Sequence, residues 1–290
     1  DYTPFLQHLG IASLNLGFGG EDAYGQYHSA YDSIDHFRRF MDPGFLYGET
    51  MAKVAGRVML RLANAELLPF EFTALAEEVG RYVDELQELA DTMRRETAER
   101  NRLLAEGAYT AAADPEATYV PPEPEEPVPH LAFAPLKNGH ARLEAAARRY
   151  EEALRGLWAG GGGAGEESRA DGSPAGGPDS ESAAGHRPPG GLDPATLAEI
   201  DRLLYRTERA LTRPEGLPGR EWFVHHLYAP GFYTGYGVKT VPGAREAIEQ
   251  REWAEADRHL TLAGEILTEL AAQIDRAAEL LEGHLEGGTE

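Results

Sequence analysis

The spacing of apolar side chains divides the chain into a short opening segment and a long helical remainder. Near the start, apolar residues with helical spacing (Phe5, Leu6 and Leu9) precede a compact apolar run at residues 11–16, which has glycine on both sides. A short apolar run bounded by glycine is typical of a buried strand. We therefore predict a helix end, a strand and then a glycine loop at the carboxyl edge of a sheet, where open α/β folds bind ligands.

Two further helices are predicted before the first long helical stretch. One begins near Asp32 or Ser33, either of which is able to cap it. The next begins at Pro43, with Asp42 as its cap, and ends at Pro69. The apolar positions that recur every three or four residues in this helix, and that we expect to be buried, are Met51, Val54, Val58 and Leu62.

Beyond Pro69, helical periodicity continues almost to the end of the chain and predicts a bundle of four helices. Asp193 and Pro194 give one of these helices a cap and a first-turn proline. The last helix carries the narrow seam of a coiled coil or bundle and is expected to end before Gly283. The apolar positions of the four helices are, in order, Phe72, Leu75, Val79, Val83, Leu86, Ala90 and Met93; Leu136, Leu143, Tyr150, Leu154 and Leu157; Leu197, Ile200, Leu204 and Leu211; and Leu260, Ala263, Leu267, Leu270, Ile274, Ala277 and Leu281.

Two polar stretches interrupt this bundle. Residues 114–130 are rich in proline and glutamate and predict an extended connector, in which the acidic run 123–126 is solvated and is not a cation site. Residues 159–191 hold about a third of the chain's 33 glycines and no large apolar side chain, which predicts a disordered insertion. The fold class is therefore mainly α: a piece of an α/β domain at residues 1–68, too small to stand alone, precedes a helical domain at residues 69–290.

Composition narrows the partners and the chemistry. The 290 residues are 42% hydrophobic and 26% charged, which is the globular range. A net charge of −22 repels phosphate backbones and argues against nucleic acid as a partner. The absence of cysteine excludes disulfides and thiolate metal sites, and no apolar run approaches the roughly 20 residues of a membrane span. Since the sequence opens on Asp1 without a leader, we expect a processed chain or one that begins inside a larger protein.

One candidate site is the Tyr27-His28 pair that follows the glycine loop. A neutral imidazole is a natural zinc ligand, and Asp32, four residues after His28, is placed to orient it. The Tyr27 hydroxyl is able to donate a hydrogen bond to an oxyanion. The residues alone favour an ordinary loop pair, because a zinc site needs several ligands and the chain contains neither a His-Glu-x-x-His motif nor cysteine.

A second candidate is the loop at residues 216–237, which combines aromatic residues, glycines and the adjacent pair His225 and His226. It either lines a pocket or packs as a loop between domains, and the residues alone favour the second interpretation. Adjacent side chains on a helix or strand point in different directions, which argues against joint metal binding by the two histidines.

The segment YHSAYDS matches the zinc-exopeptidase pattern Tyr-His-Ser/Thr, two residues, Asp, Ser/Thr, in which the histidine is the last metal ligand. FLQHLGIAS precedes it, and FMDPGF and LANAELLPF follow it. In this order of landmarks the chain resembles the glutamate carboxypeptidase II and transferrin receptor family. GLPGREWFVHHLYAP, Tyr236 and the later Val-Pro-Gly at residues 241–243 resemble that family's helical dimerisation domain.

The resemblance implies a role for several residues. His28 is similar to the terminal ligand of one zinc ion in a two-zinc site, and Tyr27 to the tyrosine that hydrogen-bonds the tetrahedral intermediate. Tyr236 resembles the tyrosine that holds the terminal carboxylate of the substrate. In the family, a glutamate activates the water that bridges the two metals. That glutamate and the other ligands precede the stretch that this chain covers, so this polypeptide by itself is not expected to bind the zinc pair or to hydrolyse a peptide.

The resemblance also implies a homodimer and a peptide substrate. A second apolar stripe, Leu262 and Ile266, flanks the seam of the last helix and is expected to need a partner. Gly235 and residues 15–17 stand where glutamate-specific members carry lysine and arginines, so a preference for acidic termini is not implied. The alternative function is a non-catalytic, transferrin receptor-like dimerisation and binding module. Members are commonly exported or membrane-anchored, and membrane contact is expected only through a segment upstream of Asp1.

Overall fold

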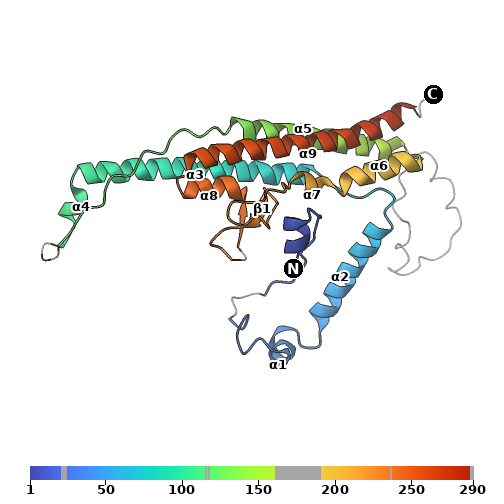
Figure 1. Ribbon diagram of the computed structural model, residues 1–290. Helices are drawn as coiled ribbons and strands as arrows, with labels where there is room; N and C mark the ends of the chain where they lie inside the picture. Colours follow the sequence, from blue (N-terminus) through green and yellow to red (C-terminus); the bar gives the residue numbers. More distant parts are fainter. Residues whose placement is uncertain (21–24, 115, 117, 161–190, 236, 288–290) are drawn as a thin grey trace.

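The computed structural model describes residues 1–20, 25–114, 116, 118–160, 191–235 and 237–287. Three long helices lie side by side and form the body of the molecule (Figure 1): α3 (Thr73–Ala105), α5 (Ala134–Gly160) and α9 (Trp253–Gly287). The most extensive contact between two elements is that of α5 with α9. The fold is therefore mainly α, as the apolar periodicity predicts.

Shorter elements are attached to this body. Within the described residues, the only strands pair antiparallel, with Tyr228 opposite Thr240. The helix α2 and the turns before it project from the body as a separate arm (Figure 1). The shorter elements are η1 (Pro4–His8), α1 (Ile34–His36), η2 (Phe37–Met41), α2 (Leu46–Ala63), α4 (Ala108–Ala111), α6 (Pro194–Leu204), α7 (Thr207–Ala210), β1 (Tyr228–Pro230), β2 (Val238–Thr240) and α8 (Pro242–Glu249).

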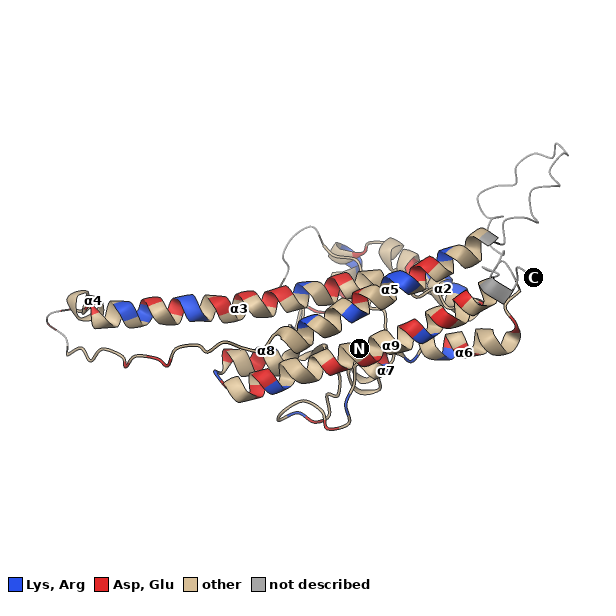
Figure 2. Ribbon diagram, turned by 90° about the horizontal axis from the view of Figure 1, so that it is seen from above, with Lys and Arg blue, Asp and Glu red and all other residues tan. Residues whose placement is uncertain are grey.

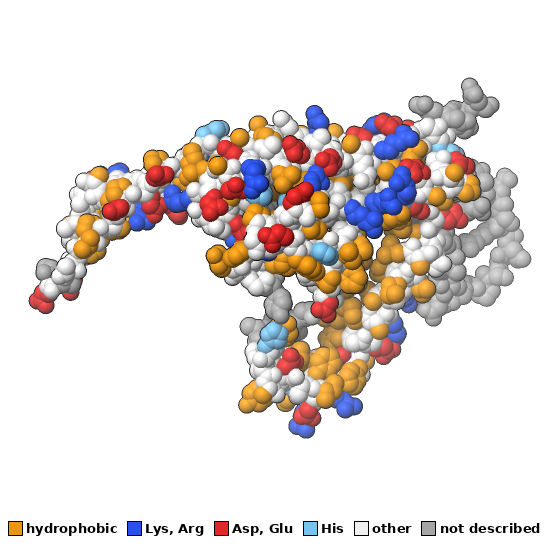
Figure 3. Space-filling model, in the orientation of Figure 1, with side chains coloured by type: hydrophobic (Ala, Val, Ile, Leu, Met, Phe, Trp, Pro, Cys, Tyr) orange, Lys and Arg blue, Asp and Glu red, His pale blue; other side chains and the backbone are white. Residues whose placement is uncertain are grey.

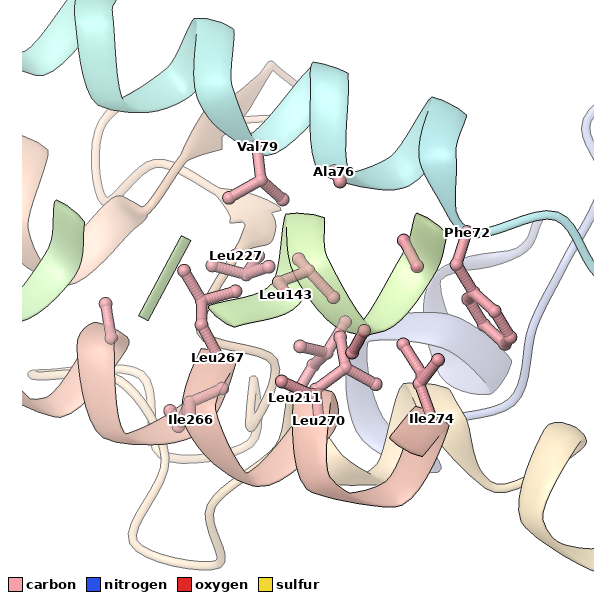
Figure 4. Close-up of a cluster of buried hydrophobic side chains, with 14 of the residues drawn as sticks. Phe72, Ala76, Val79, Leu143, Leu211, Leu227, Ile266, Leu267, Leu270 and Ile274 are labelled. Atoms are coloured by element: carbon pink, nitrogen blue, oxygen red, sulfur yellow. The ribbon is translucent and has the colours of Figure 1, made fainter. Parts of the chain in front are cut away.

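The core lies between α3, α5 and α9 (Figure 4). Residues of α6, α7 and α8 complete it. All seven predicted seam residues of α9 are buried in it. The rings of Phe72 and Tyr150 meet edge to face, with centroids 5.2 Å apart. Burying a Leu, Ile or Phe side chain stabilises the fold by about 1.5–3 kcal/mol. Apolar contact along the predicted stripes is therefore the main force that holds these helices together.

Three polar side chains accept hydrogen bonds from helix N-termini, as the sequence predicts, although one of these helices begins later than expected. Asp193 Oδ1 accepts hydrogen bonds from the first turn of α6, and Ser33 Oγ accepts one from the amide of His36 in α1. Asp42 accepts from the amides of Tyr47 and Gly48, although α2 begins at Leu46 and not at Pro43. A turn with φ of +89° at Gly44 and +60° at Phe45 separates the proline from the helix.

The structure corrects the predicted strand at residues 11–16. This segment is irregular, and its side chains are largely exposed, with Leu14 at 67%. A strand must pair its backbone amides and carbonyls with a neighbour, and no described strand lies beside it. Apolar composition alone is insufficient without that neighbour, so the α/β piece expected at residues 1–68 contains no strand in its described part.

The structure also corrects which helical faces are buried. The face predicted for α2 is not: Val54 is 42% exposed and Leu62 39% exposed, and no residue of this helix is buried. In α9 the second stripe has a partner inside the chain, because Ile266 is fully buried and Leu262 is half-buried against the core. The helix also continues beyond Gly283 to Gly287.

The connector at residues 114–130 is free of helix and strand from residue 118 on, as predicted. It is nevertheless held against α3, because Asn101 exchanges two hydrogen bonds with the backbone of Glu125. The Glu125 carboxylate also pairs with Arg100 and Arg251, so the acidic run is not simply solvated. Of the insertion predicted at residues 159–191, positions 161–190 lie outside the described residues.

The surface of the long helices mixes both signs of charge (Figure 2). On α3, for example, Arg102 forms ion pairs with Glu99 and Glu106, one turn away on either side. Such exposed pairs contribute little individually, because water and salt screen them. Among the described helices, none combines the length and the apolar character that crossing a membrane requires.

Candidate functional site

The Tyr27-His28 pair lies in a tight turn between the N-terminal segment and α1. The amide and the hydroxyl of Ser29 both donate to the carbonyl of Gln26, at 2.9 and 2.6 Å. The Gln26 side chain is buried and donates to the sulfur of Met41, which ties the turn to η2. The turn is therefore fixed at Gln26, while the side chains of Tyr27 and His28 are exposed to solvent.

His28 has a left-handed backbone, with φ at +62°, and its ring stacks on that of Tyr27 with centroids 4.0 Å apart. Non-glycine residues in this region are uncommon, and they cluster at functional sites. Tyr27, His28 and Asp32 are all exposed, Tyr27 at 66%. Ser33 rather than Asp32 caps the helix that follows.

The described residues do not by themselves form a zinc site. No three His, Asp or Glu side chains within them are placed to hold a metal ion. His28 is available as one ligand of such a site, because its ring is at the surface. Tyr236, the residue expected to contact the substrate carboxylate, lies outside the described residues.

The loop at residues 216–237 lines a cavity of about 300 Å³, which favours the pocket interpretation of this loop. The cavity is lined by residues 218–220, by residues of α8 and by the first turns of α9. The exposed side chains of Phe232 and Tyr233 form its rim. Gly219, with φ at +67°, allows the Phe232 ring to approach, because a Cβ there would lie 2.6 Å from that ring. The same loop also packs inward through Leu217 and Leu227, so the two interpretations of the sequence describe different parts of it.

A buried ion pair holds this loop on α8. Arg220 donates to the Glu246 carboxylate at 2.5 Å, and the two side chains are only 10% and 9% exposed. Arg220 also donates to the carbonyls of Pro218 and Pro230. The second carboxylate oxygen of Glu246 accepts the amide of Phe232 at 2.6 Å. The pair is thus hydrogen-bonded on both sides, which is the condition for burying opposite charges without a large penalty.

The adjacent histidines point to different neighbours, as the sequence argument expects. His225 Nε2 lies 3.0 Å from the Glu208 carboxylate, and its Nδ1 accepts from the amides of Leu227 and Tyr228. His226 instead faces His259 of α9, with ring centroids 6.5 Å apart. Burial, and secondarily the neighbouring His259, lower the pKa of His226 to about 4. His226 is therefore neutral at pH 7.

The sequence argument missed Glu246 and His259, both buried around the cavity. Each is a polar residue at an inward-facing position of a helix whose other inward positions are apolar, and this interruption is the signal that points to them. His8 of the N-terminal segment joins the outer side of the same loop. The ring of His8 stacks on that of Trp222, with centroids 4.5 Å apart. Its Nδ1 lies 2.6 Å from the backbone carbonyl oxygen of Trp222.

The part of the chain that contains this loop matches a known class of helical domain. A family model described as the transferrin receptor-like dimerisation domain matches residues 189–275, from α6 into the second half of α9. The chain therefore carries a domain of this class, and its resemblance to the glutamate carboxypeptidase II and transferrin receptor family is confirmed.

Several curated proteins are similar to the chain over most of its length. A probable glutamate carboxypeptidase of Arabidopsis thaliana, LAMP1, is 27% identical over 86% of this chain. The mouse aminopeptidase NAALADL1 is 24% identical over 97% of it, and a probable glutamate carboxypeptidase of Zea mays, VP8, is 26% identical over 98%. The chain spans only 26% of the Arabidopsis protein and 31% of each of the other two.

Proposed function

We propose that this chain is the self-associating helical part of a peptidase of the carboxypeptidase or aminopeptidase type. The observation that carries the proposal is the match of residues 189–275 to a dimerisation domain, within a chain whose similar proteins are named as peptidases. Because the helices α3, α5 and α9 share one continuous core, they form a rigid body on which a twofold interface can be built.

Sedimentation of the chain at micromolar concentration and physiological salt tests self-association. The proposal expects a species of twice 31.6 kDa. The exposed apolar side chains of α2 offer a second route to association, visible on the projecting arm in Figure 3. A variant with Leu46, Met59 and Leu60 changed to glutamine removes that route, since these side chains are 63–70% exposed. The dimer should persist in this variant, and a monomer in both proteins would contradict the proposal.

We propose further that His28 supplies one ligand to a zinc site whose other ligands come from outside the described residues. The exposed ring and the left-handed backbone of His28 support this role. In a protein that joins this chain to the remaining ligands, His28→Ala should remove one zinc equivalent by elemental analysis, while His36→Ala in α1 should remove none. Unchanged zinc content in the first variant would exclude His28 as a ligand.

Two neighbouring side chains complete the proposed site. Tyr27 is proposed to donate its hydroxyl to a substrate oxygen, and the exposure of its side chain (66%) and the stacking of its ring on His28 support this role. Tyr236 is proposed as the group that holds the terminal carboxylate of the peptide. Tyr27→Phe should lower kcat of such a protein and leave its zinc content unchanged, whereas a loss of zinc would assign Tyr27 a structural role.

The alternative is a non-catalytic dimerisation and binding module. The absence of a metal-holding group within the described residues is compatible with it. The two functions differ in one measurement. A peptidase with the upstream ligands binds zinc and cleaves peptides, whereas a receptor-like module dimerises without binding zinc.

A further inference from the structure

The cavity beside the Arg220–Glu246 pair differs from an ordinary packing defect in its electrostatic balance. Among the described residues that line the cavity, Arg220 has the only cationic side chain, and its charge is already neutralised by Glu246 at 2.5 Å. Two more carboxylates, Glu252 and Glu255, line the opening. The positive charge of Arg220 is therefore neutralised within the protein, and the cavity presents a net negative charge to a ligand.

Arg258 offsets one of these two carboxylates. It pairs with Glu255 from one turn further along α9, and both side chains are substantially exposed, at 64% and 44%. The negative excess at the opening is therefore the charge of Glu252. Glu252 is exposed at the rim, in the turn between α8 and α9.

A buried residue that lines the same cavity carries an unpartnered polar group. His259 is 6% exposed and lines the cavity, yet its Nε2 has no hydrogen-bond partner. The nearest carboxylate oxygen, on Glu255, is 3.8 Å away, which is too far for a hydrogen bond. A buried nitrogen without a partner costs free energy, which a ligand that supplies a partner recovers. Burial also lowers the pKa of His259, so the ring is neutral at pH 7 and does not oppose a cation.

The absence of a side chain at Gly243 brings this imidazole to the cavity. A Cβ at Gly243 would lie 2.6 Å from Nδ1 of His259, so no other residue leaves room for the ring in this position. The rim is aromatic: Phe232 is 47% exposed and Tyr233 85% exposed, and their rings meet edge to face at 4.8 Å. The Arg220 guanidinium already lies over the Phe232 ring, which indicates that the rim accepts cations.

We propose that this cavity binds an organic cation, an ammonium or guanidinium group on a stem the size of a lysine or arginine side chain. Glu252 attracts the charge, Tyr233 covers the stem, and His259 Nε2, in the tautomer that leaves this nitrogen unprotonated, accepts the hydrogen bond that the protein leaves unmade. A volume of about 300 Å³ lies at the small end of ligand pockets, which matches one side chain rather than an extended ligand.

Isothermal titration of the chain with Nα-acetyl-arginine amide tests the proposal. The matched neutral probe is Nα-acetyl-citrulline amide, which has nearly the same shape without the charge. We expect one site with a Kd of about 1 mM or tighter for the arginine probe and at least tenfold weaker binding of the citrulline probe. The arginine probe should also bind more weakly as salt is raised, because the attraction is electrostatic.

Variants locate the binding. Glu252→Gln and Tyr233→Ala alter exposed side chains and should each weaken binding of the arginine probe about fivefold without unfolding the chain. Glu265→Gln, an exposed position on α9 away from the cavity, is the matched control and should leave the Kd unchanged. Equal affinity for both probes, no heat from either, or an unchanged Kd in Glu252→Gln would each overturn the proposal. None of these readings depends on zinc or on dimerisation, so failure here is distinct from failure of the proposed function.

Discussion

Gly139 of α5 lies directly against Gly264 of α9. A Cβ on Gly139 would come well within 3.0 Å of the Gly264 carbonyl oxygen, and a Cβ on Gly264 would come equally close to the carbonyl oxygen of Pro135. Real Cβ atoms essentially never approach this closely, so the two helices cross backbone to backbone at this point. This crossing sets the spacing of the α5–α9 contact, the most extensive in the molecule.

Gly264→Ala should therefore destabilise the chain, because the added methyl group has to push two helices apart. Overpacking of this kind typically costs about 1–3 kcal/mol, and here we expect the upper end because the atoms met are backbone. Urea unfolding followed by circular dichroism measures the loss.

Gly283→Ala is the matched control on the same helix. Nothing lies within 4 Å of the position of the added Cβ, and the residue is in the helix interior. Alanine is the better helix former by about 0.8–1.0 kcal/mol, so this variant should be slightly stabilised. Equal effects of the two alanines would show that the glycine crossing is not tight.

Glu246→Gln should destabilise the chain by about 3 kcal/mol, because it leaves the Arg220 charge buried without its counter-charge. Glu269→Gln is the comparison, since Glu269 also pairs with an arginine, Arg213, but is 60% exposed. That exposed pair is expected to matter by less than about 1 kcal/mol. Similar losses of unfolding free energy in the two variants would contradict the assignment of Arg220–Glu246 as the structural clamp of the loop.

His226 makes stability depend on pH in a defined window. Its pKa is lowered to about 4 in the folded chain, against about 6.5 when unfolded. Between these values the unfolded chain binds more protons, so stability falls as the pH drops from about 6.5 towards 4, by up to roughly 3 kcal/mol from this group. An NMR titration of the His226 ring should show a midpoint near 4. A midpoint near 6.5 would mean that the ring reaches solvent.

Asp42→Ala should loosen the start of α2 without unfolding the body. Asp42 accepts the amides of Tyr47 and Gly48 at 3.1 and 2.9 Å, and loss of such a cap costs about 1 kcal/mol. Hydrogen exchange should accelerate in the first turn of α2 and remain unchanged in α9. Asp35→Ala, which removes only the exposed pair with Arg39, should leave both unchanged.

The helices of the body could be located from the sequence because their signal is local. The seam of α9 repeats every three or four residues, and each predicted position is buried. Asp193 and Ser33 cap helices where they were expected, since a cap acts only on amides two or three residues away. The start of α2 was wrong by three residues, because the left-handed turn at Gly44 and Phe45 leaves no mark in the apolar pattern. Its end was wrong as well, since the helix stops at Ala63 and not at Pro69.

Whether a helical face is buried depends on the element that packs against it, and the local sequence pattern does not identify that element. The apolar stripes of α2 and of α9 have the same periodicity, yet Leu62 is 39% exposed while Ile266 is fully buried. The same limit applies to residues 11–16, where an apolar run suits a strand but no described strand pairs with it. A periodic pattern states that a face is able to be buried, and only the neighbouring elements bury it.

The sequence by itself determined the mainly helical architecture, the order of its long helices and the resemblance to a dimerising peptidase family, all of which depend on residues close together in the chain. Only the tertiary structure decided that Arg220, Glu246 and His259 meet around one cavity and that Gly139 meets Gly264. These contacts join positions that are distant in sequence, and each requires the apolar core to have already fixed α5, α8 and α9 in place. Local pattern selects the elements, whereas the packing of the whole chain selects which side chains face one another.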